Sequence, residues 1–329
     1  MKRKTLVVLS AAALAATVLA GCGNKKASET TAPTTAVTEA VTEAPKPVEE
    51  KMDLVVAGGD GAGLLAAIQA VKEGADPSKI VILEKSGEVG SDIASMEDFV
   101  NAVNTDEQYD QEIDDSFETF LADIKKAGNE KNNQDLAEFM AESGELALIW
   151  LRDAGIEMEG VVKKEGSSMA RSFTAAGDAK LTELLSDHLL KEAEKLKIQI
   201  RKNTEIKEVM FSQEDGRVTG VKVAGKDGDE TIHCIALLTT DTELLPLLKT
   251  APVTFTTNAE GKETGVLVNN CAEVVGTSGE SVPGLYAAGS MIDAAVYGEK
   301  ALPGNQMTGM ILFGMTAGTE TEIYISDNQ

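Results

Sequence analysis

The chain has 329 residues, and its 54 aspartates and glutamates outnumber its 30 lysines and arginines, which gives a formal net charge of -24 at pH 7. A surface this acidic repels phosphate backbones and argues against nucleic acid as a partner. With only 2 histidines and 3 cysteines, the sequence also argues against a structural metal site, a disulfide scaffold and a Ser-His-Asp or Cys-His catalytic set.

The N-terminus has the pattern of a secretory signal. Basic residues at positions 2–4 precede an apolar stretch over residues 5–19, which is too short and too rich in alanine for a membrane span. The following Leu-Ala-Gly-Cys22 resembles the lipobox of bacterial lipoproteins, whose cysteine carries the lipid. We therefore expect a lipoprotein signal peptide over residues 1–21, lipidation at Cys22 and an extracytoplasmic protein that a lipid holds at the cell membrane. An ordinary secretory signal with a chance cysteine is the alternative.

Residues 22–50 are dominated by threonine, alanine, proline, glutamate and valine without apolar periodicity. Such a segment buries too little apolar surface to offset its chain entropy, so we expect a disordered tether. Residues 51–329 are enough for one large domain. Apart from Cys22, this leaves Cys234 and Cys271, either as a disulfide or as two separate buried thiols.

The domain opens with a pattern typical of a strand, a glycine loop and a helix. A short apolar run over residues 53–57 leads into the glycine-rich loop 58–63, and apolar residues then recur at helical spacing. A second apolar run, residues 80–84, ends in Glu84. Free backbone N–H groups and the helix dipole make such a loop a cradle for a phosphate. An acid about 20 residues after the loop is placed to accept hydrogen bonds from a ribose.

The later elements complete an α/β prediction. Helices are expected over residues 115–155, with breaks at two glycines, over 178–196 and over 307–317; their apolar faces include Phe117, Leu146, Ile149 and Leu184, and His188 is expected to be structural. Strand-like runs at residues 205–211, 217–224 and 230–238 predict an antiparallel meander, and further strands are expected after Pro252, at 266–269 and at 285–288. The predicted fold is a Rossmann-like α/β domain with a central parallel sheet, an antiparallel three-strand meander and added helices.

Several motifs resemble one known family. They are the segments at residues 53–64, 81–85, 89–90, 101–102, 216–221, 283–289, 304–305 and 313–314. In this order and spacing they are similar to the flavoprotein subunits of fumarate reductase and succinate dehydrogenase, with urocanate reductase and ketosteroid dehydrogenase relatives. The most specific is Pro-Gly-Leu-Tyr-Ala-Ala-Gly289. The resemblance implies bound FAD, with its adenosine on the first strand-helix-strand unit and its flavin near the C-terminal glycine segments.

The resemblance also implies cofactor-binding residues, while no catalytic residue is identified. The diphosphate turn would comprise Gly58, Gly59, Ala62 and Gly63, and Glu84 would hold the adenosine ribose beside Lys85. Ile206 would lie near the adenine. The remaining contacts to the diphosphate, ribityl chain and flavin would come from Gly90, Ser91, Asp92, Thr240, Gly289, Ser290 and Asn305.

The departures from the family pattern put charge or bulk where the cofactor would lie. Asp60 stands at the second glycine of the turn, and Ser91, Asp241 and Ser290 also replace family residues. Two like charges about 4 Å apart repel by about 1 kcal/mol in water and by about 4 kcal/mol at an effective dielectric of 20. Asp60 must therefore turn outward, bind a cation or weaken FAD binding.

The family's substrate-capping domain is reduced here to about residues 242–252, and Tyr297 and Ala301 stand where the family has a histidine and an arginine. We therefore expect an FAD-dependent, oxidoreductase-like protein that transfers electrons, with a possible electron-transfer partner protein, rather than one that completes fumarate reduction. The alternative is a noncatalytic lipoprotein with a decayed flavin site that acts as a binding or assembly protein. The sequence identifies no substrate.

Overall fold

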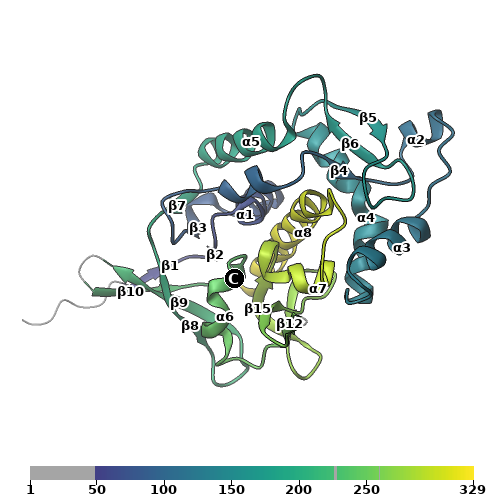
Figure 1. The fold of residues 1–329 in the computed structure, drawn as a ribbon. Coiled ribbons are helices and arrows are strands. Elements are labelled where there is room, and N and C mark those ends of the chain that lie inside the picture. The colour runs from purple at the N-terminus through teal and green to yellow at the C-terminus, as the bar shows by residue number, and fades with distance from the viewer. Residues whose placement is uncertain (1–48, 226–227, 259) are drawn as a thin grey trace, which may run out of the picture. The chain divides into compact units, whose positions relative to one another are not determined.

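The computed structural model describes residues 49–225, 228–258 and 260–329 (Figure 1). The predicted signal peptide, Cys22 and the tether up to residue 48 lie outside the described residues. Among the described helices, none combines the length and the apolar character needed to cross a bilayer.

The central sheet is built around the predicted strand-helix-strand unit. Its strand order is β14-β15-β11-β2-β3-β7, and only the β14–β15 pair is antiparallel. The bounds are β2 Leu54–Ala57, β3 Ile80–Leu83, β7 Gln199–Arg201, β11 Ala236–Thr239, β14 Glu273–Val275 and β15 Ser281–Ala287. All residues of β2, β3 and β11 are buried, as expected for parallel strands covered on both faces. The predicted central parallel sheet is thus confirmed.

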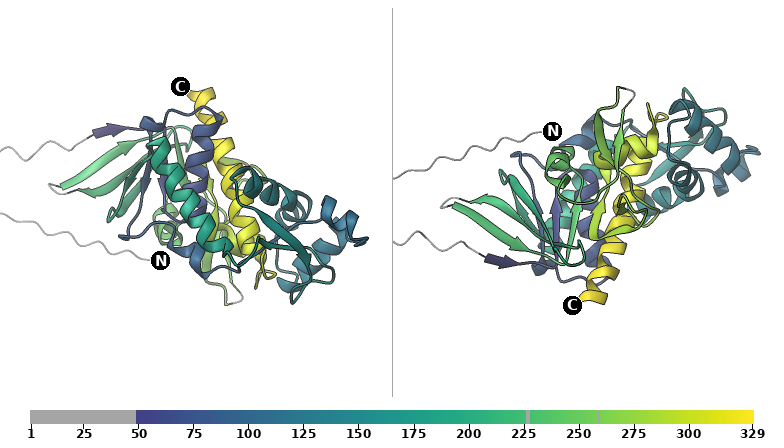
Figure 2. Two further views of the ribbon diagram at one scale, coloured as in Figure 1. Left: turned by 90° about the horizontal axis from the view of Figure 1, so that it is seen from above. Right: turned by 90° about the horizontal axis from the view of Figure 1, so that it is seen from below.

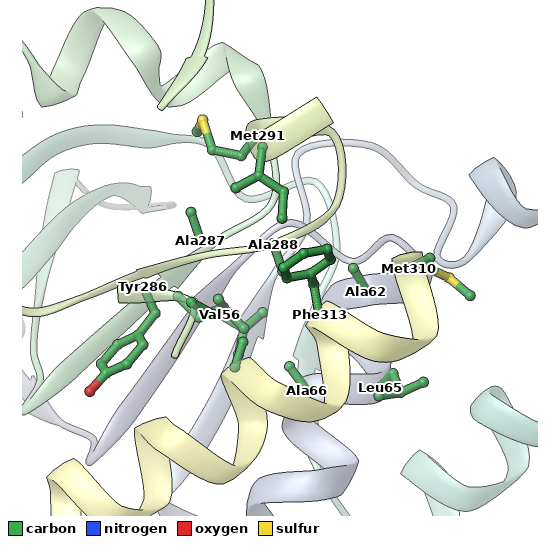
Figure 3. Close-up of a cluster of buried hydrophobic side chains, with 14 of the residues drawn as sticks. Val56, Ala62, Leu65, Ala66, Tyr286, Ala287, Ala288, Met291, Met310 and Phe313 are labelled. Carbon is green, nitrogen blue, oxygen red and sulfur yellow. The ribbon is translucent and has the colours of Figure 1, made fainter. Parts of the chain in front are cut away.

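Three long helices pack side by side against this sheet: α1 Gly61–Glu73, α5 Leu181–Leu196 and α8 Asn305–Asn328 (Figure 2). Figure 3 shows Phe313 and Met310 of α8 beside Ala62 and Leu65 of α1. The two helices come close because Gly318 carries no side chain: a Cβ there would lie 2.4 Å from the Ala66 carbonyl oxygen. The apolar contacts between α1 and α8 therefore hold the N-terminal part of α1 in place.

The antiparallel meander is confirmed, with two differences. It consists of β8 Ile206–Phe211, β9 Val218–Gly225 and β10 Gly228–His233, and β1 Glu49–Lys51 adds a parallel fourth strand on β10. The last residues of the predicted tether, 49 and 50, therefore belong to a strand. The predicted run 230–238 divides at Cys234, because Ile235 and Ala236 donate backbone hydrogen bonds to the Asp53 carbonyl and carry the chain into the central sheet.

A second group of elements consists of α2 Asp106–Asp110, α3 Phe117–Ala127, α4 Gln134–Asp153 and a small sheet with the order β4-β6-β5. The sheet strands are β4 Val100–Asn101, β5 Met158–Val162 and β6 Ser172–Ala175. Helices α3 and α4 were predicted, whereas α2 was not. Four side chains predicted on apolar helix faces are partly exposed: Phe117 of α3, Leu146 and Ile149 of α4, and Leu184 of α5 are 39%, 48%, 41% and 38% exposed.

Short elements connect these parts. They are η1 Pro77–Lys79, η2 Ser91–Ser95, η3 Thr242–Leu244, α6 Leu245–Leu248, β12 Phe255–Thr257, β13 Glu263–Val266, η4 Gly289–Ile292 and α7 Asp293–Tyr297. The strand predicted at 266–269 instead ends at Val266, and the last helix begins two residues earlier and continues eleven residues beyond the predicted 307–317. Cys234 and Cys271 are both free thiols. His188 stacks edge-on against Trp150 with ring centroids 5.6 Å apart, away from the turn described below.

Candidate functional site

The turn between β2 and α1 depends on two glycines. Gly58 has a positive φ of 122°, and a Cβ on it would lie 2.2 Å from the Thr240 hydroxyl oxygen. A Cβ on Gly63 would lie 2.2 Å from the Gly58 carbonyl oxygen. Both positions therefore exclude any side chain, and the backbone of the turn stays open at the N-terminus of α1.

Three backbone N–H groups of this turn donate hydrogen bonds to the chain's own carboxylates. Asp60 is the N-cap of α1 and accepts from the Gly63 N–H at 2.8 Å. Asp92, at the start of η2, accepts from the Gly61 N–H at 2.9 Å. Glu84, directly after β3, accepts from the Gly59 N–H at 2.8 Å. Helix N-termini attract anions, and here side chains of the chain itself provide them.

These carboxylates lie close enough to disturb one another. Burial, and after it the charge of Asp92, raise the pKa of Asp60 to about 7. The hydrogen bond from Gly63 lowers this pKa, but by less than burial raises it. Burial also raises the pKa of Asp92. In α7, burial and then the charge of Asp92 raise the pKa of Asp293 to about 6. The site therefore has an excess of negative charge at neutral pH.

Asp60, Asp92 and Asp293 line one cavity of about 200 Å³ together with Ser95, Met96, Gly289, Ser290, Ile292, Tyr297, Gln306, Gly309, Met310 and Phe313. No lysine, arginine or histidine is among these described lining residues. The Ser290 hydroxyl donates to the Thr240 carbonyl at 2.8 Å, which links the start of η4 to the end of β11.

A much smaller cavity of about 40 Å³ lies on the other side of the turn. Gly58, Lys85, Ile206, Asp241 and Glu243 are among the residues that line it. The Lys85 ammonium lies 2.5 Å from Glu243 and 3.3 Å from Glu205, so this ion-pair cluster joins β3 to the β8 and η3 segments. The cavity is well below the roughly 300 Å³ of a typical small-molecule pocket.

The largest of these three hollows is an open cleft of about 1030 Å³, which adjoins the 200 Å³ cavity through Ser290, Asp293, Tyr297 and Gln306. Lys131 and Lys300 contribute positive charge, whereas its described lining contains no arginine or histidine. The Tyr297 hydroxyl is directed away from the cleft, because it donates to the buried Asn305 carbonyl at 3.1 Å.

The structure brings most of the predicted site residues together. Gly58, Gly59, Ala62 and Gly63 lie in the turn, Glu84 contacts it, and Gly90 donates to the Gly59 carbonyl at 2.7 Å. Lys85 and Ile206 line the small cavity, Asp92, Gly289 and Ser290 line the middle one, and Thr240 is buried below Gly58. Ser91 is exposed at the start of η2.

Asn305, which was predicted to lie near the flavin, has its side chain in the core. Its side chain is fully buried, where its oxygen accepts from the Asn101 amide at 2.7 Å and its nitrogen contacts the Met140 sulfur at 3.2 Å. Asn305 thus joins α8 to β4 and α4. The sequence reasoning also missed Asp293 and the Lys85 partners, although Asp293 follows the carboxyl end of β15, where ligands of parallel sheets usually bind.

Comparison with known proteins places this site in a family. The family model described as FAD binding domain matches residues 53–262. The NADH:fumarate oxidoreductase of Klebsiella pneumoniae is 31% identical over 175 residues, or 53% of this chain and 18% of that protein. The fumarate reductase (cytochrome) of Shewanella frigidimarina is 30% identical over 176 residues, or 54% of this chain and 30% of that protein.

The fold is similar to solved structures of the same group. The open conformation of a flavocytochrome c3 fumarate reductase has a TM-score of 0.73 at 16% identity, with 85% of this chain and 79% of that chain covered. A 3-ketosteroid-delta4-(5alpha)-dehydrogenase from Rhodococcus jostii has a TM-score of 0.67 at 14% identity, with 87% of this chain and 99% of that chain covered. The matched region spans less than a third of the length of the two fumarate reductases from Klebsiella and Shewanella. From the matched domain, the chain belongs to the FAD binding domain family, and fumarate reductases are among the proteins that it is similar to.

Proposed function

We propose that this chain binds FAD and works as an extracytoplasmic, lipid-anchored electron-transfer protein of the fumarate reductase flavoprotein type. The observation that carries the proposal is the β2–α1 turn, where the N–H groups of Gly59, Gly61 and Gly63 all bind anionic oxygen. A dinucleotide diphosphate needs such a set of donors at a helix N-terminus. When bound, the flavin would supply a group that accepts and donates electrons.

The backbone of the turn fits a diphosphate, but two side chains compete with it. Gly58 and Gly63 carry no Cβ at the two positions where one would strike neighbouring atoms of the turn, and Glu84 lies at the end of β3, where it would meet the ribose. Asp60 and Asp92 accept from two of the donors that the diphosphate would use. FAD therefore binds only in a form of the site in which these two carboxylates have rotated away.

The cleft supports electron transfer rather than fumarate reduction by this chain alone. Fumarate is a dianion, so its reduction calls for cationic groups to hold its carboxylates and for an acid to deliver a proton. Lys131 and Lys300 are the cationic side chains of the described cleft lining, and both come from exposed loops. Chain segments η3 and α6 follow β11 directly, which leaves the cleft open to a partner protein.

The lipid anchor follows from the lipobox-like Leu-Ala-Gly-Cys22. We expect the full chain, expressed in a bacterial host, to sediment with the membrane fraction and to label with a fatty acid. A Cys22→Ser variant should lose the label and leave the membrane, because the proposed anchor is the lipid on this cysteine. Equal sedimentation of both proteins would contradict the anchor.

A second candidate function is a noncatalytic binding or assembly protein with a decayed flavin site. The carboxylates of Asp60 and Asp92 favour this candidate, because a site that no longer binds a diphosphate can replace it with its own acids. The cavity beside Lys85 and Ile206, where the adenosine would bind, favours this candidate as well, because its volume of about 40 Å³ is too small for that group.

The visible spectrum of the purified full chain separates the two candidates. FAD binding predicts flavin absorption bands that stay with the protein on gel filtration and are released as free FAD on denaturation. The control is Gly63→Ala, whose Cβ would strike the Gly58 carbonyl and close the turn. A colourless protein that shows no thermal shift with added FAD at any pH would contradict FAD binding and favour the noncatalytic candidate.

A further inference from the structure

We propose that Asp60 and Asp92 act together as an internal substitute for the diphosphate, so that the turn is closed by an autoinhibitory contact and FAD must displace both carboxylates to bind. This inference rests on the proposed binding of FAD. It adds a regulation of that site: FAD affinity is set by how readily the two acids leave.

The hydrogen bonds at the start of α1 give the geometric basis. The first N–H groups of a helix have no partner within the helix. Gly61 donates to Asp92 and Gly63 donates to Asp60, while the Leu64 N–H already binds the Asp60 carbonyl at 3.0 Å. The two carboxylates come from different segments, α1 and η2, and still meet at one helix end. A diphosphate oxygen cannot reach either glycine N–H while they stay there.

The surrounding charges oppose a diphosphate further. The charges of Asp92 in η2 and of Asp241 after β11 both raise the pKa of Asp60. Glu84 at the end of β3 raises the pKa of Asp92 and of Asp241, and Asp92 raises the pKa of Asp293 in α7. Among the described residues, Lys85 is the one cation near these acids, and its charge lowers the pKa of Asp241. Its ammonium is paired with Glu243 and Glu205 on the far side of the turn. Adding a doubly charged diphosphate without removing negative charge is therefore strongly unfavourable.

Protonation offers a way to open the site. A neutral carboxyl group neither repels phosphate nor holds a backbone N–H as strongly as a carboxylate does. Burial and neighbouring acids raise the pKa of Asp60 to about 7. A bound diphosphate would favour the protonated acids further, so binding takes up protons and the affinity for FAD falls as pH rises.

The test is a titration of the full chain with FAD, followed by flavin fluorescence at about pH 6 and about pH 8. The variants are Asp60→Gly, Asp60→Asn, Asp92→Asn and the double variant Asp60→Asn with Asp92→Asn. Asp60→Asn keeps an oxygen for the N-cap, so it remains informative if Asp60→Gly folds poorly. Asp241→Asn is the matched control. Asp241 adds negative charge nearby, but its carboxylate accepts a hydrogen bond from the backbone N–H of Glu243 in η3 and not from an N–H of α1.

We expect wild-type protein to bind FAD about tenfold or more tightly at the lower pH. At the higher pH, Asp60→Gly and the double variant should bind about tenfold or more tightly than wild type, and the pH dependence of the double variant should be largely lost. Asp241→Asn should change the affinity clearly less. In the FAD-free protein, the amide resonances of Gly61 and Gly63 should shift as the two acids titrate.

Three results would overturn the inference. If wild type binds FAD with the same affinity as the variants at both pH values, FAD binding stands and the autoinhibitory contact is wrong. If Asp241→Asn tightens binding as much as Asp60→Asn, general charge and not the contact controls affinity. If no protein binds FAD while the Gly61 and Gly63 amides titrate as expected, the proposed function fails, and with it the competition.

Discussion

The carboxylate of Asp60 accepts a 2.8 Å hydrogen bond from the backbone N–H of Gly63, within the same turn. This makes Asp60 the N-cap of α1 and at the same time a negative charge at the helix end where the family's cofactor diphosphate would bind. One residue thus stabilises the helix and obstructs the proposed ligand.

We expect Asp60→Asn to change how stability depends on pH. The folded-state pKa of Asp60 is raised from 3.8 to about 7, so the folded protein holds a proton that the unfolded chain releases. Its contribution is therefore fully present at low pH and is lost as pH rises from about 4 towards about 7. Asparagine keeps the N-cap but does not titrate.

Urea unfolding of wild type and Asp60→Asn across this pH range measures the effect. The variant should lose less stability between pH 5 and pH 7.5 than wild type does. Asp76→Asn is the control: Asp76 caps η1 from an exposed position by accepting from Ser78 at 2.9 Å, and its pKa is lowered rather than raised. Parallel stability curves for wild type and Asp60→Asn would show that Asp60 does not titrate in this way.

Gly63→Ala should destabilise the fold whether or not FAD binds. Its Cβ would lie 2.2 Å from the Gly58 carbonyl oxygen, and backbone must shift to relieve that contact. We expect a loss of about 1–3 kcal/mol in the free energy of unfolding. Gly87→Ala is the matched control, since the nearest atom to its Cβ is a side-chain oxygen 3.7 Å away. Denaturant unfolding of the two variants should separate them, and equal stabilities would contradict the packing of the turn.

Arg171 should be essential for folding of the α3–α4 part of the domain. Its guanidinium is fully buried and binds Asp115 at 2.8 Å and Asp123 at 2.9 Å. Arg171→Ala leaves two acids without their partner, at a cost of about 3–5 kcal/mol. Arg217→Ala, which removes an exposed ion pair with Asp215, should cost less than about 1 kcal/mol. A small change in melting temperature for both variants would contradict this role of Arg171.

Much of the fold could be predicted from the sequence because its central strands and helices have strong apolar patterns. The β2–α1–β3 unit and the meander were identified with nearly correct bounds. The small sheet of β4, β5 and β6 was missed, because Val100–Asn101 has only two residues and Met158–Val162 is mostly exposed. The exposure of Leu146 and Ile149 depends on what packs against α4, which periodicity alone does not specify.

The site was predicted less completely than the fold. Sequence comparison with the family pattern identified Asp60 as an obstacle, since a charged residue stands in a glycine turn. That Asp92 accepts from the Gly61 N–H could not be predicted, because these residues are 31 positions apart and meet only in the folded chain, whereas the contact of Asp60 with Gly63 spans only three residues. The same is true of the Lys85 pairs with Glu205 and Glu243, and of the burial of Asn305.

The competition between FAD and the two acids can be observed in a crystal structure of the full chain grown with FAD at about pH 6. We expect phosphate oxygens within hydrogen-bond distance of the Gly61 and Gly63 backbone nitrogens, with the carboxyl groups of Asp60 and Asp92 turned away. A structure in which both carboxyl groups keep these glycine N–H groups while FAD is bound would contradict this competition.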